Sequence, residues 1–185
     1  MAWIKIIDEQ HAEGKLKEVY EEITSARGKL SNIMKIHSLN PQAMKEHMDL
    51  YLSVMFSQSG LRREDCELIA VVVSSANECG YCINHHAEAL NHYWKDKEKI
   101  KKVVEDYKQL DLSVKQMAML SYAVKLTTMP NAVNENDIEN LKLHDFTDEN
   151  ILNINLIVSY FNFVNRIVLG LGVDYSEEEL KGYKY

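Results

Sequence analysis

The sequence predicts an all-α protein, a helical bundle folded as a single domain over residues 1–185. Three observations support this. Apolar residues recur at intervals of three and four along most of the chain, which is the spacing that gives a helix one buried face. The chain has only two Pro and seven Gly, so few positions interrupt a helix. No segment shows the alternating pattern of a half-buried strand, and 185 residues suffice for one full core.

The first half of the chain predicts three long helices. The first covers about 12–29, where one stripe of apolar residues recurs at helical spacing. A shorter apolar group follows it. Asn40 and Pro41 then begin a second helix, which ends near residue 56, because Asn caps a helix and Pro suits its first turn. A break precedes a third, largely buried helix over about 62–77.

The second half predicts five further helices, over about 79–94, 96–108, 113–127, 134–144 and 147–169. Ser113 opens a capping box at the start of one of them. Asn134 and Thr147 are suitable caps for the next two. Gly170 and Gly172 are expected to close the last helix.

A faint internal repeat relates the two halves at an offset of 85 residues. It aligns five identical pairs: Glu64 with Glu149, Ile69 with Ile154, Val73 with Val158, Ser74 with Ser159 and Asn77 with Asn162. The repeat suggests two similar helix units that pack together. At the positions of the second unit that match Glu67, Cys79 and Cys82, the residues are apolar. Catalytic residues are therefore expected only in the first unit.

Composition and charge exclude several kinds of function. The net charge is −7 and no cluster of Lys and Arg offsets it locally, so nucleic acid is not an expected partner. No stretch reaches the roughly 18–20 uncharged apolar residues of a membrane span, and the N-terminus lacks a signal-peptide core. Three cysteines, an odd number, do not suit a secreted disulfide framework. A cytoplasmic protein without a membrane partner is therefore expected.

The candidate site centres on a CxxC motif. Cys79 and Cys82 are three residues apart and His86 follows by four, so a helix would place all three on one face. Upstream, Glu67 lies inside a strongly apolar run, where a carboxylate is costly unless it has a partner. His86 and the thiols are the natural partners, because a turn at Gly80 would let the second helix fold back along the first.

These residue types suit thiol redox chemistry. A thiol must become a thiolate to attack a peroxide or a disulfide, and a helix N-terminus favours the anion. His86 can accept the proton of Cys82, directly or through water, and Glu67 can orient the imidazole. Cys79 can then close a disulfide with Cys82, which an external dithiol must reduce. This chemistry needs neither a metal nor an organic cofactor.

Two other functions remain open on the residues alone. The same cysteines could serve a general dithiol–disulfide oxidoreductase. Alternatively, the two cysteines with His86 and Glu67 could bind zinc in a non-catalytic assembly module, although structural zinc sites usually gather two ligand pairs. His85 would point to another helix face and is expected at the surface or an interface. Cys66 is expected to be an inert core residue.

The full motif is Glu67, eleven residues, Cys79, two residues, Cys82, three residues, His86. It resembles the alkylhydroperoxidase AhpD group of the carboxymuconolactone decarboxylase-like superfamily. Four further phrases resemble its branch of uncharacterised peroxidase-related enzymes: IHSLNP (36–41), MFSQSGLRRE (55–64), LIAVVVSSANECGYCINHH (68–86) and YFNFVNR (160–166). The resemblance covers nearly the whole chain.

The resemblance implies an all-helical AhpD-like fold, trimeric or hexameric homo-oligomers, and reduction of hydroperoxides. It implies that Cys82 reacts with the peroxide, that Cys79 is its disulfide partner, and that Glu67 and His86 relay protons. One position departs from the family, which has a further relay histidine where this chain has Tyr81, and a tyrosine is a poor base near neutral pH. Lactone decarboxylation is disfavoured, because the decarboxylases lack the cysteine pair.

We therefore expect a thiol-dependent peroxidase that acts on a hydroperoxide and is recycled by an external dithiol or a protein reductant. The last long helix adds an independent argument for a homo-oligomer. It is apolar on more than one face, and a helix that is apolar nearly all round is buried on all sides. A second strongly apolar helix, over 68–76, competes for the same core, so a subunit interface should cover part of one of them.

Overall fold

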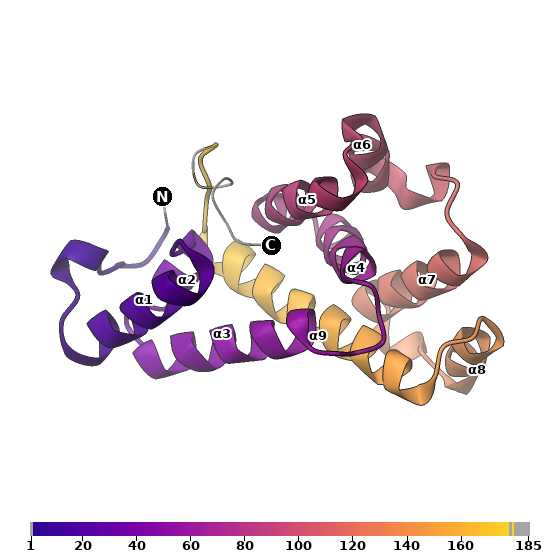
Figure 1. Ribbon diagram of the computed structural model, residues 1–185, viewed down its shortest axis with the longest axis horizontal. Coiled ribbons are helices and arrows are strands. Elements are labelled where there is room, and N and C mark those ends of the chain that lie inside the picture. The colour runs from indigo at the N-terminus through magenta and orange to yellow at the C-terminus, as the bar shows by residue number, and fades with distance from the viewer. Residues whose placement is uncertain (1, 178, 180–185) are drawn as a thin grey trace. The chain divides into compact units, whose positions relative to one another are not determined.

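The computed structural model describes residues 2–177 and 179. Over these residues the chain forms α-helices, short 3-10 turns and loops, and no strand (Figure 1). This confirms the all-α class. The chain divides into two compact units, one made of Met1–Ser53 with Arg166–Tyr185 and the other of Val54–Asn165. The assignment of residues 1–185 to a single domain stays a prediction.

The first unit begins with a 3-10 turn (Glu9–His11) and helix α1 (Gly14–Arg27). The predicted apolar stripe of α1 is buried: Leu16, Val19, Tyr20 and Ile23. The Tyr20 hydroxyl donates a hydrogen bond to the Ile7 carbonyl at 2.7 Å and so fixes the lead-in segment. Gly28 ends the helix with φ 80°, a left-handed conformation that glycine adopts without steric cost.

Helices α2 (Asn32–Lys35) and α3 (Pro41–Phe56) follow. The Asn40 side-chain oxygen accepts the backbone N–H of Ala43 at 3.1 Å, which confirms the predicted cap. Since α3 begins at Pro41, the missing backbone donor of proline falls where a helix has no acceptor for it.

A histidine pair, His47 buried and His37 half-buried, links α3 to the turn after α2. Nδ1 of His47 lies 3.4 Å from Nε2 of His37, and Nδ1 of His37 lies 2.9 Å from the Ile33 carbonyl. Burial, together with the neighbouring His37, lowers the pKa of His47 to about 3. Burial also lowers the pKa of His37. Both rings are therefore neutral in the folded protein near neutral pH.

The second unit contains most of the predicted helices. They are α4 (Arg63–Ala76), α5 (Gly80–Trp94), α6 (Lys97–Asp106), α7 (Val114–Thr128), α8 (Glu135–Leu143) and most of α9 (Asp148–Leu171), with 3-10 turns at Tyr107–Gln109 and Pro130–Ala132. Helix α4 packs against both α5 and α7 (Figure 1). Every residue of α4 from 66 to 74 is buried, so this helix forms the centre of the unit.

The predicted caps are present. Ser113, Asn134 and Thr147 each accept a hydrogen bond from a backbone N–H two or three residues further on, at 3.2, 3.0 and 3.2 Å. Ser113 and Asn134 both form complete capping boxes. Because these signals act within one helical turn, they can be read from the sequence without knowledge of the fold.

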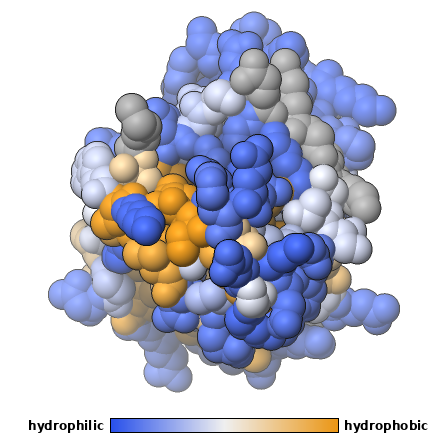
Figure 2. Space-filling model, turned by 90° about the vertical axis from the view of Figure 1, so that its left-hand side faces the viewer, coloured by the Kyte–Doolittle hydropathy of each residue, from blue (hydrophilic) through white to orange (hydrophobic). Residues whose placement is uncertain are grey.

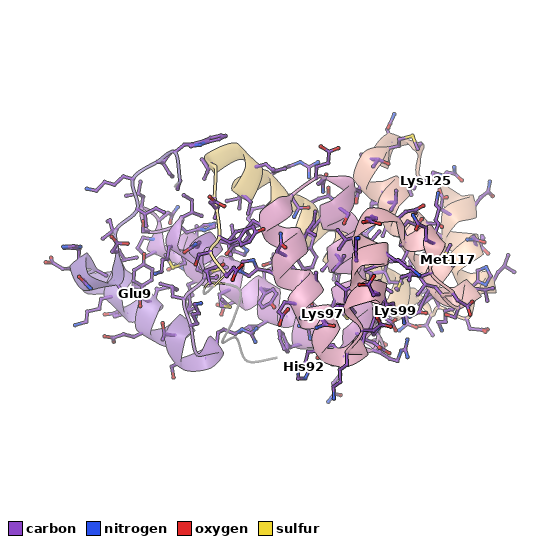
Figure 3. All side chains as sticks on the ribbon, turned by 90° about the horizontal axis from the view of Figure 1, so that it is seen from above. Glu9, His92, Lys97, Lys99, Met117 and Lys125 are labelled. Atoms are coloured by element: carbon purple, nitrogen blue, oxygen red, sulfur yellow. The ribbon has the colours of Figure 1, made fainter. Side chains whose placement is uncertain are left out.

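Charged side chains connect neighbouring helices at the surface, among them Lys99 and Lys125, which are labelled in Figure 3. Lys125 of α7 lies 2.7 Å from a carboxylate oxygen of Asp137 at the start of α8. The ammonium group of Lys99, on α6, lies 3.9 Å from the centre of the Trp94 ring at the end of α5, a distance suited to a cation–π contact.

The end of α9 differs from the prediction. Gly170 lies within the helix, which continues to Leu171. Gly172, with φ 64°, is the residue that ends it. A side chain at Gly172 would overlap the Trp3 ring, because its Cβ would stand 2.4 Å from the nearest atom of that indole. The close approach of Trp3 and the left-handed backbone both require glycine at this position.

Within the described residues, α9 alone is long and apolar enough to cross a membrane, judged by length and composition. A core helix passes the same test, and Ile154, Ile157 and Phe161 of α9 are buried in the protein. The absence of a membrane partner stays a prediction. Figure 2 shows a patch of apolar surface bordered by hydrophilic residues on the face that it presents. The homo-oligomer likewise remains a prediction.

Candidate functional site

The site is built on the junction between α4 and α5. The backbone N–H of Cys79 donates to the Ser74 carbonyl at 2.9 Å and closes the end of α4. Glu78 takes the left-handed conformation, with φ 55°. The sequence had placed this turn at Gly80, but Gly80 is the first residue of α5 and its φ is not positive. The strained position is therefore Glu78, directly before the first cysteine, and such strain often accompanies functional sites.

The two cysteines face each other at the start of α5. Cys79 is the N-terminal cap residue and Cys82 lies in the first turn. Both are reduced and buried, with 0% and 2% of their surface exposed. The Cys82 thiol lies where it can donate to the Cys79 sulfur. The spacing that the sequence used thus brings the sulfurs within hydrogen-bond reach.

The electrostatics of the pair favour the anion on Cys79. The hydrogen bond from the Cys82 thiol lowers the pKa of Cys79 despite burial. The same hydrogen bond, with burial and the neighbouring Cys79 charge, raises the pKa of Cys82. The assignment of Cys82 as the attacking sulfur stays a prediction.

Glu67 lies on α4 with 1% of its side chain exposed and contacts His86 and Arg63. One carboxylate oxygen is 2.6 Å from Nδ1 of His86, as the sequence predicted. The other is 2.5 Å from the Arg63 guanidinium, where the sequence had suggested a thiol. Burial alone raises the pKa of Glu67, but the charges and hydrogen bonds of His86 and Arg63 outweigh it, and the pKa lies below its usual value.

The contact with Glu67 fixes the tautomer of His86. A carboxylate only accepts hydrogen bonds, so Nδ1 of His86 carries a hydrogen and Nε2 is the nitrogen that can accept a proton. The imidazole and the Phe161 ring are nearly perpendicular, with 4.5 Å between ring centres. The ring is therefore held from two sides.

Arg63 is a site residue that the sequence analysis missed. It stands one helical turn before Glu67, at the spacing at which opposite charges pair on a helix. Its guanidinium also lies over the Phe56 ring, 4.2 Å from the ring centre. The i, i+4 spacing of the two charges was a usable signal, because a buried Glu requires a partner and Arg63 is the nearest cation on the same face.

The other candidate residues lie outside this cluster. His85 is half-buried rather than fully at the surface. Its Nδ1 lies 2.9 Å from the Tyr81 carbonyl and its ring stacks on that of Tyr81. Cys66 is buried, and burial raises its pKa to about 11, which agrees with an inert core residue. Tyr81, at the position of the family's extra histidine, is also buried.

A second missed residue is Asn165 of α9. Its side chain is fully buried, hydrogen-bonds with those of Ser74 and Asn77, and acts to lower the pKa of Cys82. It belongs to the quoted phrase YFNFVNR, but periodicity gives no sign that an Asn in an apolar helix will bond side chains 88 and 91 residues earlier in the chain.

The geometry does not favour the zinc alternative. Among residues 2–177 and 179, no three His, Cys, Asp or Glu side chains are grouped as ligands for a metal ion. Glu67 would have to leave both Arg63 and His86 to join such a site.

The fold and the site together define a class of protein: an all-α protein with a dithiol at a helix start and a buried Glu–His pair beside it. Comparisons with known proteins show what the chain is similar to. The carboxymuconolactone decarboxylase family model matches residues 41–125. The AhpD-core, uncharacterised peroxidase-related protein from Ralstonia eutropha JMP134 is 26% identical with a TM-score of 0.86, over 97% of this chain and 94% of that one.

An uncharacterised peroxidase-related protein from Silicibacter sp. TM1040 is 28% identical with a TM-score of 0.84, over 95% of this chain and 93% of that one. These matches confirm the resemblance, seen in the sequence, to the AhpD-like part of the carboxymuconolactone decarboxylase superfamily. The debrominase Bmp8, solved in complex with 2,3,4-tribromopyrrole, is 19% identical with a TM-score of 0.78, over 95% of this chain and 92% of that one, and shares the fold.

Proposed function

We propose that this protein is a thiol-dependent peroxidase that reduces small hydroperoxides through Cys79 and Cys82. The family assignment supports an alkylhydroperoxidase-type role in general. The observation that carries the specific proposal is the contact between the buried Glu67 carboxylate and Nδ1 of His86, on the helix that also bears the cysteine pair. A nucleophile, a base and an acid that orients the base are the parts of an activated-thiol site.

The first step is attack of the Cys82 sulfur on the peroxide. Nε2 of His86 takes the thiol proton, a sulfur–oxygen bond forms and the oxygen–oxygen bond breaks. The departing alkoxide takes a proton and leaves as the alcohol. The sulfur loses two electrons to the peroxide and becomes a sulfenic acid. Glu67 stabilises the imidazolium that exists between the two proton transfers.

The second step closes a disulfide. The Cys79 thiol attacks the Cys82 sulfenic acid, a sulfur–sulfur bond forms, and water leaves with the thiol proton. An external dithiol then reduces the disulfide and is itself oxidised to a disulfide, which restores both thiols. The existing hydrogen bond between the two side chains means that little movement is required before they join.

The burial of the sulfurs supports a small oxidant. Cys79 and Cys82 have 0% and 2% of their surface exposed in the isolated chain. A disulfide on a folded protein could not meet either sulfur without an opening of the site, whereas a hydroperoxide presents only a terminal oxygen. This favours the peroxidase over a general dithiol–disulfide oxidoreductase that acts on proteins. It also means that a protein reductant would need the junction at Glu78 to open.

Stopped-flow mixing of the reduced protein with hydrogen peroxide and with cumene hydroperoxide tests the proposal, with thiol loss as the readout. Cys82→Ser should abolish the fast phase. Cys79→Ser should keep it but stop at the sulfenic acid. Cys66→Ala is the matched control and should react like wild type. A fast phase that survives in Cys82→Ser would overturn the assignment of the attacking sulfur.

Competing substrates separate the alternatives. Debromination has only the shared fold in its favour, so 2,3,4-tribromopyrrole is the control substrate and should consume thiols far more slowly than a hydroperoxide. A small disulfide should react more slowly as well. The metal content of protein purified without chelator tests the zinc-binding alternative, and one tightly held zinc per chain would favour it over the peroxidase.

A further inference from the structure

Cys79 joins α4 to α5 through its backbone. Its N–H donates to the Ser74 carbonyl at 2.9 Å, and its carbonyl accepts the N–H of Ile83, also at 2.9 Å. The first of these bonds closes the end of α4, and the second opens α5. The position of the Cys79 side chain relative to α5, which carries Cys82, therefore depends on how the residues before Cys79 are held.

The backbone directly before Cys79 needs support from its surroundings. Glu78 has φ 55° and an exposed side chain. A residue other than glycine takes this left-handed conformation at a cost, and it persists only where the surrounding structure determines it. Asn77 is the C-terminal cap residue of α4, and its side chain is bonded to α9. The contacts of the junction with α9 supply this support.

Helix α9 holds the junction at two points. Nδ2 of Asn77 donates to the side-chain oxygens of Asn162 and Asn165, at 3.1 and 2.9 Å, and these three side chains form an amide cluster. Nδ2 of Asn165 also donates to the Ser74 hydroxyl oxygen at 3.2 Å. Ser74 and Asn165 have no exposed surface, so water does not compete for this bond. Ser74, whose carbonyl holds Cys79, and Asn77 are thus both bonded to the same helix.

The far end of the amide cluster fixes which atoms donate. Nδ2 of Asn162 donates to the Val158 carbonyl and to the Thr127 hydroxyl oxygen, both at 3.0 Å. The Thr127 hydroxyl gives its own hydrogen to the Ala123 carbonyl at 2.8 Å, so both groups beside this nitrogen are acceptors. The side-chain oxygen of Asn162 therefore faces Asn77, which must supply a donor. An ionised aspartate at position 77 would have no hydrogen to supply.

On the basis of the proposed function, we propose that Asn77 is a positioning residue for disulfide closure. Its bonds to α9 hold the α4–α5 junction, and with it Cys79, where the sulfur can join that of Cys82. Closure of a disulfide removes conformational freedom from the two thiols, so a junction that is fixed beforehand lowers the entropy that closure costs. The effective concentration of one thiol toward the other is correspondingly higher. Asn77 acts through the backbone of Cys79 and takes no part in the chemistry itself.

A role in stability alone makes a different prediction. Hydrogen bonds that stabilise the dithiol and disulfide forms equally change the free energy of unfolding of both forms. They leave the equilibrium between the two forms unchanged, because only a difference between two states shifts their equilibrium. The thiol–disulfide equilibrium of the folded protein therefore separates positioning from simple stabilisation.

The test is equilibration of the folded protein with reduced and oxidised glutathione, in a Cys66→Ala background that leaves one cysteine pair. Asn77→Asp keeps the shape of the side chain but replaces its donor by an acceptor. The effective concentration of the pair should fall about tenfold, because two hydrogen bonds are lost, and this raises the reduction potential by about 30 mV. Asn155→Ala is the matched control. Its amide, also on α9, donates to the Tyr122 hydroxyl at 2.8 Å outside the amide cluster, so its loss should leave the equilibrium unchanged.

An equilibrium that is unchanged in Asn77→Asp, or shifted equally in Asn155→Ala, would overturn the proposal. If Asn77→Asp does not fold, Asn162→Ala decides, because it removes one of the two acceptors of Asn77 and leaves the residues of the junction intact. It should lower the effective concentration by a smaller factor, about threefold, and no change would reject the proposal.

Equilibration with glutathione uses no peroxide. A protein that reduces no hydroperoxide would refute the proposed function, while the glutathione equilibrium would still show whether Asn77 positions the pair. Where peroxide is reduced rapidly, Asn77→Asp should slow the conversion of the sulfenic acid to the disulfide about tenfold and slow the attack on the peroxide by less. A larger yield of the dimedone adduct reports this difference. Equal slowing of both steps would show a general loosening of the site and reject the positioning role.

Discussion

Replacement of Glu67 by Gln is the sharpest test of the relay, because the structure predicts its effect atom by atom. The carboxylate now accepts hydrogen bonds from Arg63 at 2.5 Å and from His86 at 2.6 Å. A Gln side chain has one acceptor oxygen and one donor nitrogen. Arg63 can only donate, so it keeps the oxygen, and the amide nitrogen is left facing the imidazole of His86.

His86 must then change tautomer. Its Nδ1 becomes the acceptor for the amide, so the hydrogen moves to Nε2, and the nitrogen that should take a proton no longer can. An imidazole held in the wrong tautomer loses its role as a base, as it does in the serine-protease triad. General acid–base groups contribute on the order of 10²–10⁴-fold. We therefore expect the second-order rate of peroxide reduction at neutral pH to fall by about that factor in Glu67→Gln.

The variant should also lose stability, with a defined dependence on pH. The Arg63 guanidinium loses its counter-ion, but with 19% of its side chain exposed it retains some water. The cost should be about 1–3 kcal/mol, below the ~3–5 kcal/mol of a fully buried pair. The pKa of Glu67 is lowered in the folded state. The contribution of ionised Glu67 to the free energy of unfolding is therefore full above the pKa of Glu67 in the unfolded chain, and it is lost as pH falls through the pKa of Glu67 in the folded protein. The free energies of unfolding of wild type and Glu67→Gln should therefore converge in acid.

Stopped-flow thiol oxidation and the pH dependence of Cys82 alkylation measure the kinetic effect, and urea unfolding measures the stability. Glu64→Gln is the matched control. Glu64 lies on the same helix, is paired with Arg62 at 2.6 Å and has 25% of its side chain exposed, so its neutralisation should leave the rate unchanged. His86→Ala should resemble Glu67→Gln, and the double variant should be little slower. Superimposable alkylation curves for wild type and Glu67→Gln would refute the relay.

Three further outcomes are expected. Mild peroxide should give a reversible disulfide between Cys79 and Cys82 while Cys66 stays reduced; peptide mapping checks this, and a Cys66 disulfide within the monomer would contradict it. The pKa of His47 is about 3 in the folded protein, against an ordinary 6.5, so the free energy of unfolding should decrease as pH falls below 6.5. Urea unfolding should show a decrease of about 2 kcal/mol between pH 7 and pH 5. This decrease should largely disappear when His47 and His37 are both replaced by Gln. Light scattering at micromolar concentration should give the mass of a homo-oligomer, and a monomeric mass would rule that assembly out.

The sequence was sufficient wherever the cause of a structure lies within a few residues. The Ser113 and Asn134 caps act over one turn and are present as predicted. The buried stripe of α1 follows from spacing alone. Burial also made the Glu67–His86 contact predictable, since a carboxylate in an apolar helix needs a partner and the motif supplies one four residues after Cys82.

The two predictions that the structure corrected, a turn at Gly80 and a helix end at Gly170, failed for the same physical reason, which is tertiary packing. Glu78, not Gly80, carries the left-handed turn, because the hydrogen bond from Cys79 to Ser74 sets where α4 ends, and composition does not reveal that choice. Gly170 stays helical because Trp3 and the left-handed backbone place the helix end at Gly172.

The hydrogen bonds of Asn77 with Asn162 and Asn165 show what the internal repeat could and could not predict. The repeat paired Asn77 with Asn162 as equivalent positions, and the two side chains are in fact hydrogen-bonded to each other. The repeat gave no indication of Asn165, whose hydrogen bonds with Ser74 and Asn77 depend on how α9 packs against α4. Long-range polar contacts of this kind leave no periodic signal.

The two partners of Glu67 change how the relay should be understood. Arg63 supplies a fixed positive charge 2.5 Å from one carboxylate oxygen, so Glu67 does not depend on His86 alone for its charge. His86 and Arg63 together keep the pKa of Glu67 below its usual value despite complete burial. The relay proposed above uses Glu67 to orient His86 and to stabilise the imidazolium that forms once Cys82 has given up its proton.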